Sequence, residues 1–276
     1  MHIITDTSSL YSPQEGKELG MTVIPACALI DGQVYRDYED ISSEDFVRLI
    51  QDGAVPTSSQ PAIGEVMEIF EHTEEEILYL AIGDGLSGTY QNAMGARNCM
   101  EKNDHIHIID TKTLAGAQRY LVQKALKMRE EGIKMEEMIR RIKESVETSV
   151  SFVIPSDFDF LKRSGRLTPI AAAIGGAIKI VPVLTQTEDM RRIRPFAVKR
   201  SRRKAVEAIM EQLRELGVGK DYVISIGHGG VAEVAKEILE QIKTQFSEAT
   251  TEVLQLAPAL ITHGGPGCIT IQAIHK

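Results

Sequence analysis

The residues best suited to chemistry are hydroxyl side chains that stand between two prolines. Thr57, Ser58 and Ser59 lie between Pro56 and Pro61, and apolar residues follow at helical spacing. We therefore expect a helix with Ser58 or Ser59 at its N-cap and Pro61 in its first turn. A helix N-terminus carries free N–H groups and a partial positive charge. With hydroxyls around it, this one would bind a small anion; the alternative is an ordinary capped helix.

A second loop of this kind follows the apolar run at residues 77–82. Residues 83–88 match the GxGxxG pattern of dinucleotide-binding sites, and Asp110 follows further along the chain. This pattern leaves open a nicotinamide-dependent oxidoreductase. Against it, the motif is not in the first strand–helix unit, and Ser87 and Thr89 place hydroxyls where close helix packing is expected.

The two hydroxyl loops could serve one site. In open α/β sheets, ligands bind beyond the carboxyl ends of the strands, so Ser58 and Ser87 can converge on one anionic group. In the second half, an Arg offers forked donors that suit a carboxylate or a phosphate, and a His beside glycines can donate to a phosphoryl oxygen or hold a lid. Structural roles are the alternative for each. The supporting residues are Thr57, Ser59, Gly88, Thr89, Arg166 and His263.

The elements that must position these residues alternate between strands and helices in the first half. This alternation predicts an α/β fold with a doubly wound parallel sheet and helices on both faces. The predicted strands are residues 2–5, 21–30 (as one strand or two), 77–82 and 105–109, and the predicted helices are 43–52, 87–100, 114–132 and 134–150.

The pattern of strands and helices in the second half predicts a further α/β domain with a mixed sheet. We therefore expect two domains, at residues 1–150 and 151–276. An apolar stretch at 167–184 contains Pro, Gly and Lys, which indicates a buried helix and a strand rather than a membrane span. The other predicted strands are 151–154, 222–226, 251–255 and 268–274, and the predicted helices are 201–216 and 232–246.

Composition limits the class of protein. Of 276 residues, 43% are hydrophobic and 25% are charged, as in ordinary globular proteins, and the net charge of −8 argues against nucleic-acid binding. The three cysteines are isolated, and no zinc-binding motif occurs. With no signal peptide and no long apolar run, we expect a cytoplasmic protein without stable membrane insertion.

One segment departs from the acidic average. Residues 191–204 are rich in Arg and Lys and contain no acidic residue. Such a patch can steer an acidic partner, so Arg200 and Arg202 are candidate docking residues for a partner protein or an anionic membrane surface. The alternative is a solvated hairpin followed by a helix start.

Motifs spread in order over essentially the whole chain resemble the DegV family, the fatty-acid-binding proteins that serve bacterial fatty acid kinases. The motifs are Thr5-Asp6-Thr7, the Pro-Thr-Ser-Ser-Gln-Pro run at 56–61, Leu-Ser-Gly-Thr-Tyr-Gln at 86–91, Asp-Thr-Lys at 110–112, Leu-Lys-Arg-Ser-Gly-Arg at 161–166 and His-Gly-Gly-Pro-Gly at 263–267. The chain departs from the family at Thr7, where Ser is usual, at Ser58, often Thr, and at Val181, often Lys.

The resemblance implies a two-domain α/β protein that buries one long-chain fatty acid, with carboxylate contacts from Ser58 and Ser87. It also implies a partner ATP-dependent kinase that phosphorylates this carboxylate, giving an acyl phosphate for phospholipid synthesis. The chain itself would then be a carrier without enzymatic activity or cofactor. A lipid store or sensor without a kinase partner is the alternative.

A fatty acid needs a polar contact for its carboxylate and a dry apolar tunnel for its tail. Burial of each CH₂ stabilises the complex by about 0.8 kcal/mol, so a sixteen-carbon tail contributes on the order of 10 kcal/mol before ordering costs. The stretch at 170–184 is rich in small residues and suits a narrow tunnel, although an ordinary core helix would have the same composition.

Overall fold

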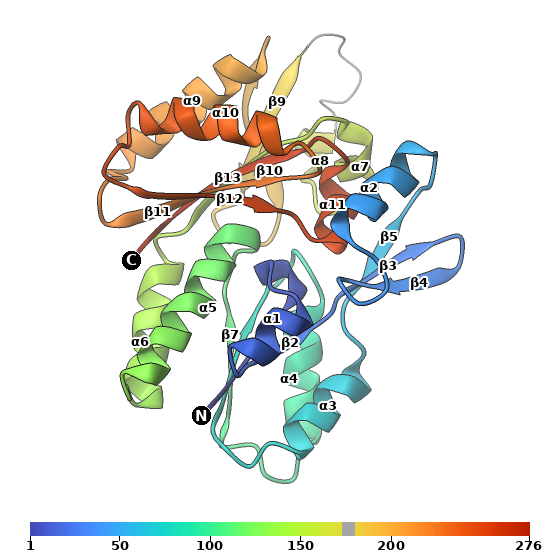
Figure 1. Cartoon of the computed structure of the whole chain (residues 1–276), viewed down its shortest axis with the longest axis vertical. Coiled ribbons are helices and arrows are strands. Elements are labelled where there is room, and N and C mark those ends of the chain that lie inside the picture. Colours follow the sequence, from blue (N-terminus) through green and yellow to red (C-terminus); the bar gives the residue numbers. More distant parts are fainter. Residues whose placement is uncertain (173–179) are drawn as a thin grey trace.

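The computed structural model describes residues 1–172 and 180–276 and has an α/β architecture with two main sheets (Figure 1). The N-terminal sheet lies in the lower half of this view, and the C-terminal sheet lies in the upper half. The first sheet is parallel and the second is mixed. The predicted fold class is therefore confirmed.

The N-terminal sheet has the strand order β2-β1-β6-β7, and all of its strand pairs are parallel. The chain adds β2 on one side of β1 and then β6 and β7 on the other side. The order therefore reverses between β1 and β6, the place where open α/β sheets bind ligands. The strands are β1 (His2–Asp6), β2 (Thr22–Ile24), β6 (Ile77–Ala81) and β7 (Ile106–Asp110).

Helices cover both faces of this sheet because its strands bury side chains on both sides. Leu78 and Leu80 pack toward α5 and α6, whereas Ile77 and Tyr79 pack toward α3 and α4. The helices are α3 (Ile63–Glu71), α4 (Thr89–Cys99), α5 (Ala115–Glu130) and α6 (Met135–Val146), with the short η1 (Thr7–Ser9) and α1 (Pro13–Glu18) after β1.

The C-terminal sheet has the order β10-β9-β8-β13-β11-β12, in which only the β11–β12 pair is parallel. Helices α9 and α10 pack on one face, and the other face is turned toward the first half of the chain. The strands are β8 (Val150–Ile154), β9 (Val181–Gln186), β10 (Ile193–Lys199), β11 (Tyr222–His228), β12 (Thr250–Gln255) and β13 (Ile269–His275). The helices are α7 (Phe158–Arg163), α8 (Pro169–Ala172), α9 (Arg202–Glu215), α10 (Ala232–Lys243) and α11 (Pro258–Gly264).

A small antiparallel sheet, which the sequence did not predict, corrects the first expectation. Residues Thr57–Ser59 form strand β5, with Ser58 opposite Ala28 on β3, so neither serine caps a helix. Helix α3 begins at Ile63, and Ala62 at its N-cap provides no side-chain hydrogen bond. Cross-strand pairing overrides the local capping signal. The sheet order is β4 (Gln33–Arg36), β3 (Cys27–Ile30), β5, and α2 (Ser43–Gln51) lies between β4 and β5 in the chain.

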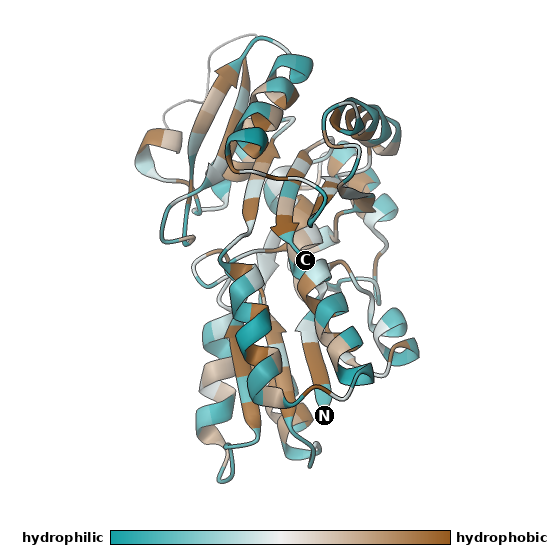
Figure 2. Ribbon diagram, turned by 90° about the vertical axis from the view of Figure 1, so that its left-hand side faces the viewer, coloured by the Kyte–Doolittle hydropathy of each residue, from teal (hydrophilic) through white to brown (hydrophobic). Residues whose placement is uncertain are grey.

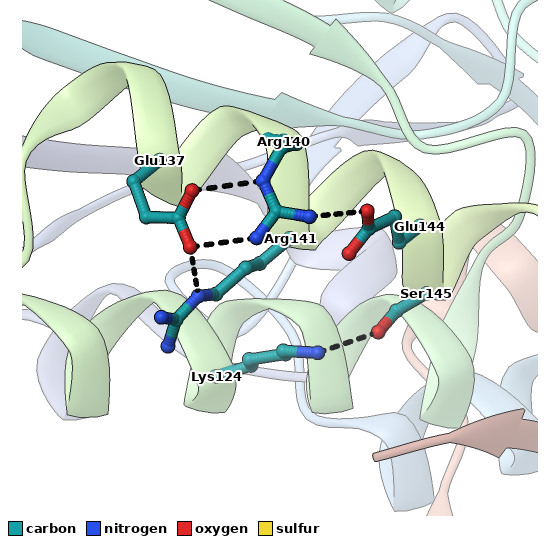
Figure 3. A network of polar contacts seen from close by, with 6 residues as sticks. All are labelled: Lys124, Glu137, Arg140, Arg141, Glu144 and Ser145. Atoms are coloured by element: carbon teal, nitrogen blue, oxygen red, sulfur yellow. Dashed lines mark hydrogen bonds and ion pairs between the residues drawn. The ribbon is translucent and has the colours of Figure 1, made fainter.

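Hydrophobic residues gather on the strands and on the inward sides of the helices (Figure 2). On α6, Glu137 accepts hydrogen bonds from Arg140 and Arg141 at 2.6–2.8 Å (Figure 3). These guanidinium groups lower the pKa of Glu137 to about 2. Lys124 on α5 donates to Ser145 on α6 at 2.7 Å, so polar contacts also tie the two helices together. Within residues 1–172 and 180–276, no helix has the length and apolar content that crossing a bilayer requires.

The first half packs against the second where α5 begins. A Cβ atom added at Gly116 would lie 2.2 Å from the Cβ of Ser225 on β11, so only glycine permits this approach. The Gly116 N–H donates to Gln272 Oε1 at 2.9 Å, and Gln272 Nε2 donates to the carbonyl of Leu114 at 2.9 Å. One glycine and one buried amide thus join α5 to the C-terminal sheet.

We predict that Gly116→Ala lowers the free energy of unfolding by about 1–3 kcal/mol, because the new methyl group overpacks the contact with Ser225. Urea unfolding measures this change. Gly64→Ala is the control, since a Cβ there meets open space, and it should change stability by less than about 0.5 kcal/mol. Adding Ser225→Gly to Gly116→Ala should recover part of the loss. Equal effects of the two Ala substitutions would contradict this account.

Candidate functional site

A cavity of about 150 Å³ opens between the two main sheets. Asp6 at the end of β1 and Ile82 after β6 line it, so the cavity lies at the point where the strand order reverses. Its lining contains both polar and apolar side chains. The polar lining includes six residues that the sequence analysis singled out: Ser58, Ser59, Ser87, Thr89, Arg166 and His263.

A hydrogen bond across the cavity wall joins two of these residues. The Oγ of Ser58 lies 2.7 Å from the Nε2 of His263. Ser58 is held by β5, which pairs with β3, and His263 is held by α11, which contacts both β5 and β3. Strand pairing and helix packing therefore bring together two side chains from opposite ends of the chain.

His263 is neutral in this environment. Its side chain is half-buried and lines the cavity. Burial, with a smaller contribution from the charge of Arg166, lowers the pKa of His263 to about 4. The tight turn after it needs glycine: Gly265 has φ +77°, and a Cβ there would lie 2.7 Å from the ring of Phe160. The His-Gly-Gly run is thus a packed helix end.

The loop that carries Ser87 reaches the same cavity. Ser87 Oγ lies 2.9 Å from Thr89 Oγ1 and accepts from the Thr89 N–H at 3.3 Å. Gly88 itself does not line the cavity, but a Cβ there would lie 3.0 Å from Gln60, so the two hydroxyl loops touch at this glycine. Asn92 on α4 also donates to the carbonyl of Pro61 at 2.9 Å.

The glycines of residues 83–88 have a structural explanation. A Cβ at Gly83 would lie 2.9 Å from the backbone of Lys112, and a Cβ at Gly85 would lie 2.7 Å from the carbonyl oxygen of Arg191. Asp110 accepts from the backbone N–H groups of Asp84 and Lys112 at 3.0 and 2.9 Å. Close packing therefore accounts for the GxGxxG pattern without a dinucleotide.

Arg166 adds a cation to the polar lining. Its Nε donates to the carbonyl of Leu86 at 3.1 Å, and its Nη1 donates to the carbonyl of Ser164. Both acceptors are neutral, and burial lowers the pKa of the guanidinium from its ordinary value. A partly buried Arg without a carboxylate partner among the described residues is suited to an anionic ligand.

The apolar lining of the cavity includes Val153, Leu161, Leu184 and Ile193, which pack with Ala171 of α8. Part of the predicted tunnel stretch is here: Leu184 lines the cavity, and Ala171 is buried beside it. Ile170, in contrast, is 74% exposed and does not line the cavity. Residues 173–179 of this stretch lie outside the described residues.

Two predicted groups lie elsewhere. Thr57 is exposed on β5 and does not line the cavity. Arg200 and Arg202 are exposed at the start of α9, away from the cavity lining. Gln60 and helix α11 were not predicted as parts of the site. A signal for α11 exists in the sequence, because Pro258 and Gly265 are the residues that favour the beginning and the end of a helix.

Comparison with known proteins identifies the family of this chain. The model of the family named "Uncharacterised protein, DegV family" matches residues 1–276. The chain belongs to the DegV family. A DegV domain-containing protein of Listeria monocytogenes is 30% identical over 277 residues, which cover 97% of this chain and 95% of the relative. The resemblance inferred from the motifs is confirmed.

Two solved DegV structures have the same fold. DegV, a fatty acid binding protein from Bacillus subtilis, is 25% identical with a TM-score of 0.86, covering 100% of this chain and 99% of that chain. A fatty acid binding DegV family protein from Streptococcus agalactiae is also 25% identical, with a TM-score of 0.87, and covers 100% of this chain and 98% of that chain.

The lowered pKa of His263 predicts a pH effect on stability. The unfolded His takes up a proton near pH 6.5, whereas the folded one does so only near pH 4, so stability present above pH 6.5 is lost as the pH falls through this range. Between pH 7 and pH 5, the wild type should lose about 2 kcal/mol more than His263→Gln. Urea unfolding at both pH values measures this difference, and an equal loss would contradict it.

Proposed function

We propose that this DegV protein binds one long-chain fatty acid in the cavity between its sheets. The observation that carries the proposal is a single cavity whose lining combines hydroxyl, imidazole and guanidinium groups with aliphatic side chains. A fatty acid combines the same two characters in its carboxylate and its alkyl chain. The likeness over the full chain to two DegV proteins that bind fatty acids supports it.

In this proposal the carboxylate lies beside Ser58 and Ser87, with Arg166 as the nearby cation. The hydroxyls donate to the carboxylate oxygens, and neutral His263 orients the Ser58 hydroxyl. Ser59, Gly88 and Thr89 shape the region around the head group, and Thr57, which is exposed, contributes only through its strand. Ser at position 58 keeps the hydroxyl that the family often supplies from Thr.

The tail then extends along the apolar side, where Val153, Leu161 and Leu184 lie. We accordingly propose that residues 1–150 supply the carboxylate loops and that residues 151–276 supply the tunnel, with Arg166 and His263 reaching the head group from the second part. Each buried CH₂ contributes about 0.8 kcal/mol, so the tail supplies most of the affinity, and the head group determines orientation more than affinity.

We further propose that the bound carboxylate is the substrate of a separate ATP-dependent kinase, in the cytoplasm. The kinase transfers the γ-phosphoryl group of ATP to a carboxylate oxygen, which gives ADP and an acyl phosphate for phospholipid synthesis. The DegV protein then acts as a carrier and needs no cofactor. Arg200 and Arg202 are exposed at the start of α9, and neither forms an ion pair with any part of the chain that the structure describes, so both are free to meet an acidic partner surface.

The double variant Ser58→Ala, Ser87→Ala should bind palmitate roughly 10-fold to 100-fold more weakly than the wild type, because hydrogen bonds to a charged group are lost. Titration calorimetry on delipidated protein measures the affinity. Ser247→Ala is the control, since Ser247 is exposed in the turn between α10 and β12. Unchanged affinity in the double variant would remove the carboxylate role from these residues.

Mass spectrometry of a solvent extract tests the ligand class directly. We expect a fatty acid in roughly stoichiometric amount. A nicotinamide cofactor without lipid would instead favour the oxidoreductase alternative.

Arg200→Ala, Arg202→Ala should slow acyl phosphate formation by a fatty acid kinase with ATP and leave palmitate affinity unchanged, because both residues lie outside the cavity. Arg214→Ala at the other end of α9 removes the same type of charge and is the control. A normal rate in the double variant would exclude docking at this patch. Absence of any phosphorylation of the wild type would favour a lipid store or sensor.

A further inference from the structure

Asp37 is a buried carboxylate without a place in the proposed chemistry. It is 0% exposed and follows β4. Its Oδ2 accepts from the Thr7 hydroxyl at 2.9 Å, and its Oδ1 accepts from the backbone N–H of Ala259 at 3.0 Å. Burial raises the pKa of Asp37 to about 7, so the fold keeps this group at an energetic cost. The contacts of Asp37 indicate a structural role that offsets this cost.

The contact with Ala259 supplies a missing helix cap. Helix α11 starts at Pro258, and Ala257 at its N-cap has the extended backbone of a capping residue but no side chain that accepts a hydrogen bond. The carboxylate of Asp37 takes that place from a segment more than two hundred residues away in the chain. His263 lies one turn further along the same helix, so the cap fixes the helix that carries the imidazole.

The carboxylate of Asp37 is also linked, through Thr7 and strand β3, to Ser58, the hydrogen-bond partner of His263. Thr7, which donates to Asp37, accepts from the N–H of Ala26 at 3.0 Å, immediately before β3. Strand β3 pairs with β5 and so places Ser58 opposite Ala28. Hydrogen bonds and strand pairing therefore lead from Asp37 to both sides of the Ser58–His263 bond.

We propose that Asp37 is a positioning residue, which caps α11 in place of Ala257 and so holds the His263 imidazole against Ser58. This inference rests on the proposed function only in taking the ligand of the site to be a fatty acid. The arrangement it explains is present in the protein without any ligand, so it is tested on delipidated full-length protein.

The test is the ¹⁵N spectrum of the imidazole nitrogens, because these signals depend on the hydrogen bond at Nε2. The chain has seven His residues, and the signals that disappear in His263→Gln identify His263. Ser58→Ala provides the signal position of a His263 without its partner. We expect Asp37→Ala to move the His263 signals to that position, whereas Asp37→Asn, whose amide oxygen still accepts from Ala259, keeps them in place.

A second variant separates positioning from general stability. In Asp37→Ala, Ala257→Asp, the new carboxylate stands at the N-cap itself and should return the His263 signals to the wild-type position. The proposal is overturned if Asp37→Ala leaves the His263 signals unchanged. If that variant does not fold, the double variant decides: a folded protein with wild-type signals supports the proposal, and an unfolded protein or displaced signals overturn it. Failure of the wild type to bind palmitate would refute the proposed function. It would not change how these spectra bear on the role of Asp37.

Discussion

Ser58 and His263 are separated by 205 positions in the chain, yet their side chains share a hydrogen bond of 2.7 Å. This contact depends on a small sheet that holds Ser58 and on a seven-residue helix that holds His263. Both residues line the cavity, so this part of its polar lining forms only when the two elements meet. The electrostatics follow from the same contact, since the burial that joins the two residues also keeps His263 neutral.

Glycines and buried polar groups fix how closely the two halves of the chain approach each other. Gly116 lets α5 approach β11, and Gly85 lets the Ser87 loop approach the turn at Arg191. At these points a methyl group would collide with backbone or with a core side chain, so the two halves of the chain meet at fixed distances. The buried amide of Gln272 then accepts from the N–H of Gly116 and donates to the carbonyl of Leu114, so backbone groups at this contact are paired.

Much of the fold was accessible from the sequence, because local patterns carry it. The apolar run of β6 and the helical spacing of Met135, Met138 and Ile142 in α6 both report burial directly. Strand β5 carries no such pattern, since it consists of Thr57, Ser58 and Ser59, and only its pairing with β3 makes it a strand. Its polar residues between two prolines therefore suggested a helix cap. Helix α11 was missed because it is too short to show a period.

The sequence by itself determined the fold class and the family, and it predicted the chemical character of the candidate site. That prediction rests on residue types and their spacing, which can be read from the linear sequence. The features are hydroxyls at two expected strand–helix junctions, an Arg, and a His beside glycines. Only the tertiary structure decided which of these groups face one another. On strand β5, Thr57 is exposed, whereas Ser58 meets His263 and Ser59 lines the cavity. Which residues of this strand reach the cavity is decided by its pairing with distant segments, and no local pattern contains that information.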